Sequence, residues 1–72
     1  MTNSPTETVQ KNLKKFRKQK GLTQLKLSLL AGVSKEYITA IELGKTTPSI
    51  KRLGMIANAL NIEIYKFFKN FD

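Results

Sequence analysis

The sequence predicts an all-α fold of five short helices in one domain, residues 1–72, with residues 1–3 as a loose tail. Apolar residues recur three or four positions apart along most of the chain, which places them on one face of a helix. Serine, threonine or glycine stands at the ends of these segments, where helix caps are expected. No stretch alternates apolar and polar residues between hairpin turns, so the sequence indicates no sheet.

The first helix is expected over residues 5–20. Ser4 and Glu7 have the spacing of a capping box, and Pro5 suits the first helical position. Gly21 can adopt the left-handed conformation that ends a helix. The apolar face would hold Val9, Leu13 and Phe16, and the other face carries Lys11, Lys14, Lys15 and Lys18. These lysines form either a solvated face or a salt-screened attraction for DNA.

Two shorter helices follow. Thr23 can cap the second helix, which Gly32 ends. Ser34 can cap the third helix, which Gly44 ends. The residues expected to be buried are Leu27, Leu30 and Ala31 in the second helix, and Ile38 and Ile41 in the third.

The last two helices complete the expected bundle. Ser49 can cap a fourth helix and Asn61 can end it, because asparagine tolerates the left-handed conformation. Its apolar face would consist of Ile50, Leu53, Ile56, Ala57 and Leu60. Gly54 lies inside this helix at a cost of up to about 1 kcal/mol relative to alanine, which a close approach of another helix would explain. A fifth helix is expected over residues 63–68.

The composition favours a polyanionic partner. The net charge is +8, from 13 basic and 5 acidic residues, which points to nucleic acid or an anionic membrane surface. Histidine and cysteine are absent, which removes the usual general base, nucleophilic thiol and zinc ligands. We therefore expect no enzyme, no metal and no cofactor. No apolar run approaches the roughly 20 residues that span a bilayer, so we expect a cytoplasmic protein that does not bind membrane.

The segment 23–43 has the form of a helix-turn-helix. Only Gly32, Val33 and Ser34 separate the two helices, and so short a joint makes them cross steeply. In this arrangement the second helix lies in the major groove of DNA. The outward face of that helix would carry Lys35, Glu36, Thr39 and Ala40.

Three stretches carry a family resemblance: "LKKFRKQKGLTQ", "LAGVSKEYITAIELGKTTPS" and "IANALNIEIYKFF". From Leu13 to Phe68 the chain resembles the lambda-repressor and Cro-like helix-turn-helix family, also called the XRE family. The resemblance implies a DNA-binding regulator from a prokaryote, a phage or a mobile element. It implies base-reading roles for Lys35, Glu36, Thr39 and Ala40, and contact with the DNA backbone for Gln24, Tyr37, Lys45 and Thr46. It also implies a structural ion pair between Arg17 and Glu42, and dimerisation around the last helix.

The chemistry of these residues supports such roles. A lysine can donate to guanine and a glutamate can accept from cytosine, whereas the methyl groups of Thr39 and Ala40 can contact thymine. Lys26 and Lys35 lie in first turns, where a cation is unfavourable and a nearby phosphate would compensate for it. Two positions have an ordinary alternative. Glu36 would be favoured by the helix dipole alone, and Ala40 is simply a good helix former.

The chain departs from the family pattern at four positions. Leu43 replaces a residue that is often arginine or asparagine, so one polar DNA contact is expected to be missing. Ser28 replaces an alanine, and its hydroxyl needs a partner such as the carbonyl group one turn back. Leu25 and Leu29 stand where polar residues are usual. They are either a harmless exposed pair or a contact for a second protein.

The C-terminal aromatic residues are expected to serve both the core and a dimer. They are Tyr65, Phe67, Phe68 and Phe71. One or two of them should close the core, because a domain of this size has marginal stability, and the surplus would form the dimer surface.

The favoured function is thus a sequence-specific regulator that binds a palindrome-like operator on double-stranded DNA as a homodimer. A restriction-modification controller or an antitoxin-like autoregulator would fit this description. Two alternatives remain open. One is a protein-interaction module of the same fold that uses Leu25, Leu29 or the C-terminal aromatic residues, and the other is a non-specific polyanion binder.

Overall fold

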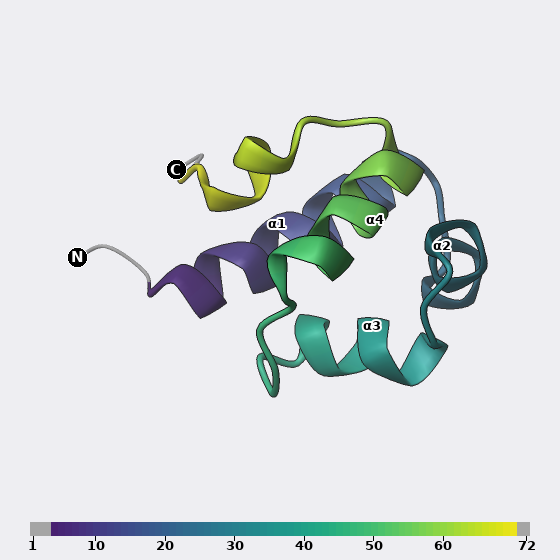
Figure 1. Cartoon of the computed structure of the whole chain (residues 1–72), viewed down its shortest axis with the longest axis horizontal. Coiled ribbons are helices and arrows are strands. Elements are labelled where there is room, and N and C mark those ends of the chain that lie inside the picture. The colour runs from purple at the N-terminus through teal and green to yellow at the C-terminus, as the bar shows by residue number, and fades with distance from the viewer. Residues whose placement is uncertain (1–3, 71–72) are drawn as a thin grey trace.

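The computed structural model describes residues 4–70, and every regular element within that range is helical (Figure 1). The elements are α1 (Pro5–Gln19), α2 (Gln24–Ala31), α3 (Lys35–Glu42), α4 (Ile50–Leu60) and the 3-10 helix η1 (Ile64–Phe68). The all-α prediction is confirmed. The predicted fifth helix is present at Ile64–Phe68, but it is a 3-10 helix. This short segment forms i→i+3 bonds such as Lys66 N–H to the Glu63 carbonyl, at 3.1 Å. The expected tail, residues 1–3, lies outside the described range.

Each α-helix begins where a hydroxyl group accepts a backbone hydrogen bond. The Oγ atoms of Ser4, Thr23, Ser34 and Ser49 accept from the N–H groups of Glu7, Lys26, Tyr37 and Arg52 at 3.2, 3.0, 3.0 and 3.2 Å. Ser4 and Glu7 complete the predicted capping box. The four predicted N-caps are confirmed, because these hydroxyl groups bond N–H groups that have no partner inside the helix.

One apolar core lies between the helices. Its buried apolar residues are Val9, Leu13, Phe16, Leu27, Ala31, Ile38, Ile41, Leu53, Ile56, Ala57, Leu60 and Phe67. α1 packs against α3 and η1, and α2 packs against α3 and α4. Figure 1 shows the result: α3 runs along one edge of the molecule, and η1 lies at the opposite edge. No helix within residues 4–70 has the length and apolar character that crossing a membrane requires.

Three expectations about the core are wrong. Leu30 is 57% exposed, because the inward stripe of α2 runs through Leu27, Ser28 and Ala31 and leaves Leu30 to one side. Ile50 is 69% exposed, because it begins α4 one turn before the buried part of that helix. Gly54 does not serve a close helix approach, since a Cβ atom added there would have no neighbour within 4 Å.

Phe67 belongs to the core and not to the surface. It is 0% exposed, and its ring meets the Phe16 ring edge-on with centroids 5.8 Å apart. Asn12 fixes the backbone around it by donating to the carbonyl oxygens of Lys66, Phe67 and Lys69 at 3.2, 2.8 and 2.7 Å. The prediction that Phe67 lies in a dimer interface is therefore wrong. Asn12, the buried residue that anchors η1 to α1, was not predicted from the sequence.

Candidate nucleic-acid interface

The turn between α2 and α3 sets the direction of α3. Gly32 adopts the left-handed conformation, with φ of 75°, and its N–H donates to the Ser28 carbonyl oxygen at 2.9 Å. The Val33 N–H donates to the same oxygen at 3.1 Å, and its side chain packs against the core. The Ser28 hydroxyl donates to the Leu25 carbonyl oxygen at 2.7 Å, which gives it the predicted backbone partner. Because of this turn, α3 begins only four residues after the end of α2 and runs in a different direction from it (Figure 1).

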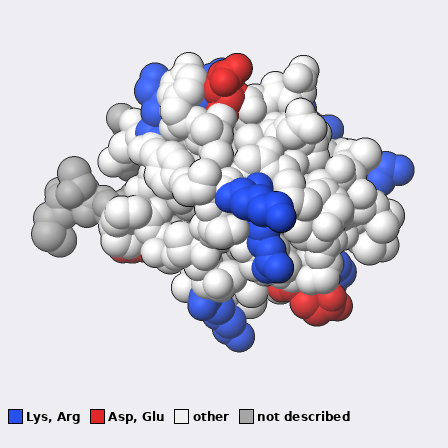
Figure 2. All heavy atoms as spheres, viewed as in Figure 1, with Lys and Arg blue, Asp and Glu red and all other residues white. Residues whose placement is uncertain are grey.

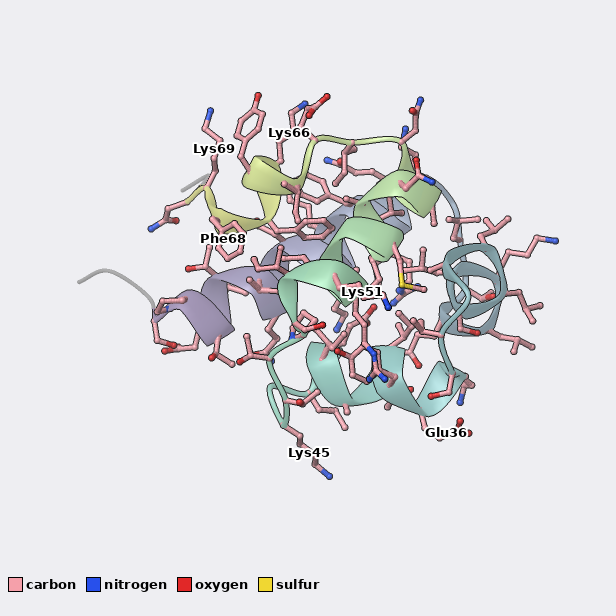
Figure 3. All side chains as sticks on the ribbon, viewed as in Figure 1. Glu36, Lys45, Lys51, Lys66, Phe68 and Lys69 are labelled. Atoms are coloured by element: carbon pink, nitrogen blue, oxygen red, sulfur yellow. The ribbon has the colours of Figure 1, made fainter. Side chains whose placement is uncertain are left out.

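α3 presents an outward face of mixed chemistry. Ile38 and Ile41 are buried on its inner side, with 0% and 1% of their surface exposed. Lys35 and Glu36 are exposed on the outer side, and Thr39 and Ala40 are half-buried there. Figure 3 shows Glu36 projecting away from the molecule at one end of α3, and Lys45 doing so near the other end. The four residues predicted to read bases thus share one accessible face.

A polar network ties this face to the interior. The Arg17 guanidinium donates twice to the Glu42 carboxylate, from Nε at 2.6 Å and from Nη2 at 3.0 Å, and from Nη1 to the Leu22 carbonyl oxygen at 2.7 Å. Gln24 Nε2 donates to Glu42 Oε1 at 3.1 Å. The Thr39 hydroxyl donates to Gln24 Oε1 at 2.8 Å. The ion pair implied by the resemblance is present between α1 and α3, and the hydrogen bonds of Gln24 extend the network to α2.

This network keeps Glu42 ionised despite its burial. Burial raises the pKa of the Glu42 carboxyl group. The hydrogen bonds from Arg17 and Gln24, together with the charges of Arg17 and Lys14, lower it by a larger amount. The pKa of Glu42 therefore lies below its ordinary value. The hydrogen bonds that Arg17 donates to the Glu42 carboxylate raise the pKa of Arg17. A charged pair at this depth is stable because every buried polar side-chain atom in the described residues has a partner.

Gln24 is the first residue of α2, and part of its side-chain amide group is already hydrogen-bonded within the protein. An amide has two N–H donors and one acceptor oxygen. In Gln24 the oxygen and one donor serve the network, and the second donor has no role in it. Lys26 lies in the same first turn with an exposed side chain. The phosphate contacts expected of both residues stay predictions.

The loop after α3 is held against α1. Gln10 Nε2 donates to the Glu42 carbonyl oxygen at 3.0 Å, and the Thr6 and Thr47 hydroxyl groups lie 2.6 Å apart. Gly44 has φ of 75°, a left-handed conformation that favours glycine. A Cβ atom there would lie 2.8 Å from Gln10 Oε1, so the Gln10 side chain would also have to move. This loop carries two residues expected near the DNA backbone. They are Lys45, which is exposed, and Thr46, which is half-buried.

A concave surface lies between the start of α3 and the start of α4. Tyr37 forms part of its wall, half-buried against the core, and the Arg52 guanidinium lies 5.0 Å from the centroid of the Tyr37 ring. Lys51 and Arg52 are exposed at this surface. The largest basic area in Figure 2 lies at the centre of the view, where Figure 3 labels Lys51.

Lys51 and Arg52 were not among the site residues predicted from the sequence, although a signal for them was present. Both lie in the first turn of α4, where the helix dipole disfavours cations. The same observation singled out Lys26 and Lys35. No group of three acidic side chains among residues 4–70 could hold a metal ion.

A family model described as Helix-turn-helix matches residues 13–67. The chain belongs to the helix-turn-helix family. The HTH-type transcriptional regulator YqaE of Bacillus subtilis is 43% identical over 53 residues, which are 74% of this chain and 46% of YqaE. The immunity repressor protein of Bacillus phage phi105 is 37% identical over 57 residues, which are 79% of this chain and 40% of that repressor. The chain thus spans less than half the length of these two relatives.

A solved structure of similar length carries the same fold. The restriction-modification controller protein C.AhdI from Aeromonas hydrophila is 32% identical, has a TM-score of 0.81, and matches over 83% of this chain and 87% of its own. The relatives named here are a transcriptional regulator, an immunity repressor and a restriction-modification controller. The helix-turn-helix family is one of regulators and not of enzymes, as the sequence predicted.

Two sets of exposed apolar residues lie outside the helix-turn-helix face. On α2, Leu25 is 53% and Leu29 is 70% exposed, and Leu30 lies beside them. On η1, Tyr65 is 55% and Phe68 is 47% exposed, and Lys69 Nζ lies 5.8 Å from the centroid of the Tyr65 ring. Phe71, also expected in a dimer interface, lies outside the described residues. Leu43 is 59% exposed at the end of α3, where its apolar side chain offers no hydrogen bond.

Proposed function

We propose that this chain is a sequence-specific DNA-binding regulator that places α3 in the major groove. The observation that carries the proposal is the accessible face of α3, which a buried ion pair and a capped turn hold in a fixed direction. Lys35, Glu36, Thr39 and Ala40 would contact base edges. A rigidly presented helix with donor, acceptor and methyl groups on one side has the chemistry that base reading needs.

The DNA backbone would be held by residues around this helix. The expected phosphate contacts are Gln24, Lys26, Tyr37, Lys45 and Thr46, to which we add Lys51 and Arg52. The net charge of +8 supports this role, because phosphate neutralisation supplies most of the non-specific affinity for DNA. Relatives named as a phage immunity repressor and a restriction-modification controller support control of transcription, which in a prokaryote takes place in the cytoplasm.

A homodimer would present two such helices to one operator. Tyr65 and Phe68 are exposed aromatic side chains on η1, and exposed apolar surface of this kind is typical of an interface. Two subunits related by a two-fold axis would read half-sites about one helical turn apart on a palindrome-like operator.

Selection of bound duplexes from a random pool tests the proposal. With competitor DNA at roughly physiological salt, we expect enrichment of a palindrome. Lys35→Ala should relax the preference at one base pair of each half-site, by about 1–3 kcal/mol, and leave the others unchanged. The matched control is Lys11→Ala, an exposed lysine on α1. No enrichment by folded protein would overturn the proposal.

The contribution of Lys51 and Arg52 to phosphate binding can be measured separately. The affinity of the wild type should fall linearly with salt on logarithmic axes, and the double change Lys51→Ala and Arg52→Ala should reduce that slope by about 2. Base preferences should stay the same, because phosphate contacts carry no sequence information. An unchanged slope would remove both residues from the interface.

A second candidate function rests on α2. Two of its leucines, Leu25 and Leu29, expose more than half of their surface and would suit contact with another protein. If the chain acts by binding another protein, Lys35→Ala should have little effect on regulation. Loss of regulation in Leu25→Ser with Leu29→Ser, at unchanged DNA affinity, would favour this candidate.

A further inference from the structure

The side chain of Thr39 carries a hydroxyl group and a methyl group, and the hydroxyl group is already hydrogen-bonded within the protein. Its hydroxyl donates to Gln24 Oε1 at 2.8 Å, and Gln24 in turn donates to Glu42 at 3.1 Å. A hydroxyl group has a single hydrogen, so the proton that Thr39 gives to Gln24 is not available to a base. The polar group of Thr39 thus serves α2 on the inner side of the interface.

The methyl group of Thr39 takes no part in this hydrogen bond. The hydroxyl and the methyl group diverge from Cβ, so the methyl group does not point along the hydrogen bond toward Gln24. A β-branched side chain has few allowed rotamers in a helix, and the hydrogen bond selects one of them. Thr39 is half-buried on the outer face of α3, one turn after Lys35 and next to Ala40.

We propose that Thr39 selects thymine through its methyl group while its hydroxyl holds the Gln24 amide in place. The inference rests on the proposed function and assigns a base preference within it. The C5-methyl group of thymine is the apolar feature of the major groove, and an apolar contact distinguishes thymine from cytosine and from uracil. The Gln24 amide, fixed at its oxygen and at one N–H, keeps its second N–H in a defined direction.

The two roles of Thr39 can be separated by two conservative substitutions. Thr39→Ser keeps the hydroxyl and removes the methyl group. Thr39→Val keeps a methyl group and removes the hydroxyl. The measurement is the affinity for the selected duplex and for copies in which each thymine is replaced in turn by uracil, which removes only the C5-methyl group.

In each half-site we expect one thymine whose single replacement by uracil weakens binding of the wild type about fourfold, because one buried methyl contact is lost. In Thr39→Ser this ratio should fall to about one. In Thr39→Val the ratio should persist while all duplexes bind more weakly by a common factor, as in Gln24→Ala. The matched control is Thr6→Ser, which removes a methyl group on α1, outside the proposed interface.

A measurement without DNA checks the hydrogen bond itself. In the free protein, Thr39→Val should shift the NMR signals of the Gln24 side-chain amide, and Thr39→Ser should leave them in place. Unshifted Gln24 signals in Thr39→Val would overturn the positioning role.

The DNA outcomes separate this inference from the function on which it rests. If the wild type prefers its selected duplex but Thr39→Ser retains the thymine-to-uracil ratio, the role of Thr39 alone is wrong. The same holds if Thr39→Val abolishes the ratio, since the hydroxyl would then read the base. If the wild type prefers no sequence, the proposed function fails and the role of Thr39 fails with it.

Discussion

Glu42 joins three helices through two of its functional groups. Its carboxylate accepts from Arg17 on α1 and from Gln24 on α2, and its carbonyl oxygen accepts from Gln10 on α1. Only 4% of the Glu42 side chain is exposed, so its charge depends on these partners and not on water. Removing one member of such a pair leaves the other as a buried charge without a partner. This lowers the free energy of unfolding far more than the loss of a surface ion pair does.

Glu42→Ala should therefore lower the free energy of unfolding by at least about 1 kcal/mol, and toward about 3 kcal/mol if Arg17 finds no water. Arg17 keeps its bond to the Leu22 carbonyl oxygen, which limits the loss. Denaturant unfolding measures the change, and Glu63→Ala, at an exposed position, is the control. A Glu42→Ala curve that overlays the wild type would show that the pair contributes nothing.

The same residue predicts a pH dependence. The pKa of Glu42 is lower in the folded chain than in the unfolded chain. Its contribution is thus fully present above about pH 4.3, the ordinary value, and is lost as the pH falls through the lower folded-state pKa. Wild-type stability should drop more steeply than that of Glu42→Gln when the pH is lowered from about 5 toward 3. Parallel pH curves for the two proteins would contradict this assignment.

α3 is an element that could not exist alone. It has eight residues, whereas isolated helices shorter than about 12–15 residues are marginal in water. The Ser34 hydroxyl satisfies a free N–H at its start, and the glycine turn at Gly44 ends it. Ile38 and Ile41 supply the packing that fixes it. The stability of α3 therefore depends on its contacts with α1 and α2.

α4 contains a position that can be improved. Gly54 has ordinary helical geometry and no atom within 4 Å of an added Cβ, so Gly54→Ala should raise the free energy of unfolding by about 0.5–1 kcal/mol. Gly32→Ala is the contrasting variant and should destabilise, because φ is 75° there. Thermal unfolding of both measures the effect. Destabilisation by Gly54→Ala would mean that a partner approaches α4 in solution.

At the scale of the whole molecule, the two proposed binding surfaces are separate. Figure 3 shows Glu36 and Lys45 along the edge formed by α3 and its loop, and Lys66, Phe68 and Lys69 at the opposite side. A dimer formed through η1 would therefore leave α3 free. DNA binding and dimerisation could then occur together, as two half-sites on one operator require.

Phe67 and Phe68 provide a matched test of this division. Phe67→Ala should lower the free energy of unfolding by about 3–5 kcal/mol, because it removes a fully buried ring. Phe68→Ala should leave the fold intact and increase the monomer fraction, since 47% of this side chain is exposed. Light scattering at tens of micromolar reports the mass. A wild type that is monomeric at that concentration would count against the dimer.

The four α-helices and their ends follow from the sequence alone, whereas the 3-10 type of η1 does not. Capping residues act through bonds within one turn, and Ser4, Thr23, Ser34 and Ser49 all cap as predicted. The motif spacing and the family resemblance located the face of α3, because a three-residue turn leaves little freedom in how two helices cross. These features depend on neighbours in the chain, which the sequence displays directly.

Which apolar and polar residues are buried depends on how the helices pack against one another. Phe67 and Phe68 are adjacent and chemically identical, yet only Phe67 lies where α1 and η1 meet. Leu30 and Ile50 fit helical spacing, but no described element covers them. The bond from Thr39 to Gln24 joins residues 15 positions apart on two helices, and no local pattern encodes it. Burial and side-chain pairing arise from packing between elements, and packing is a property of the whole fold.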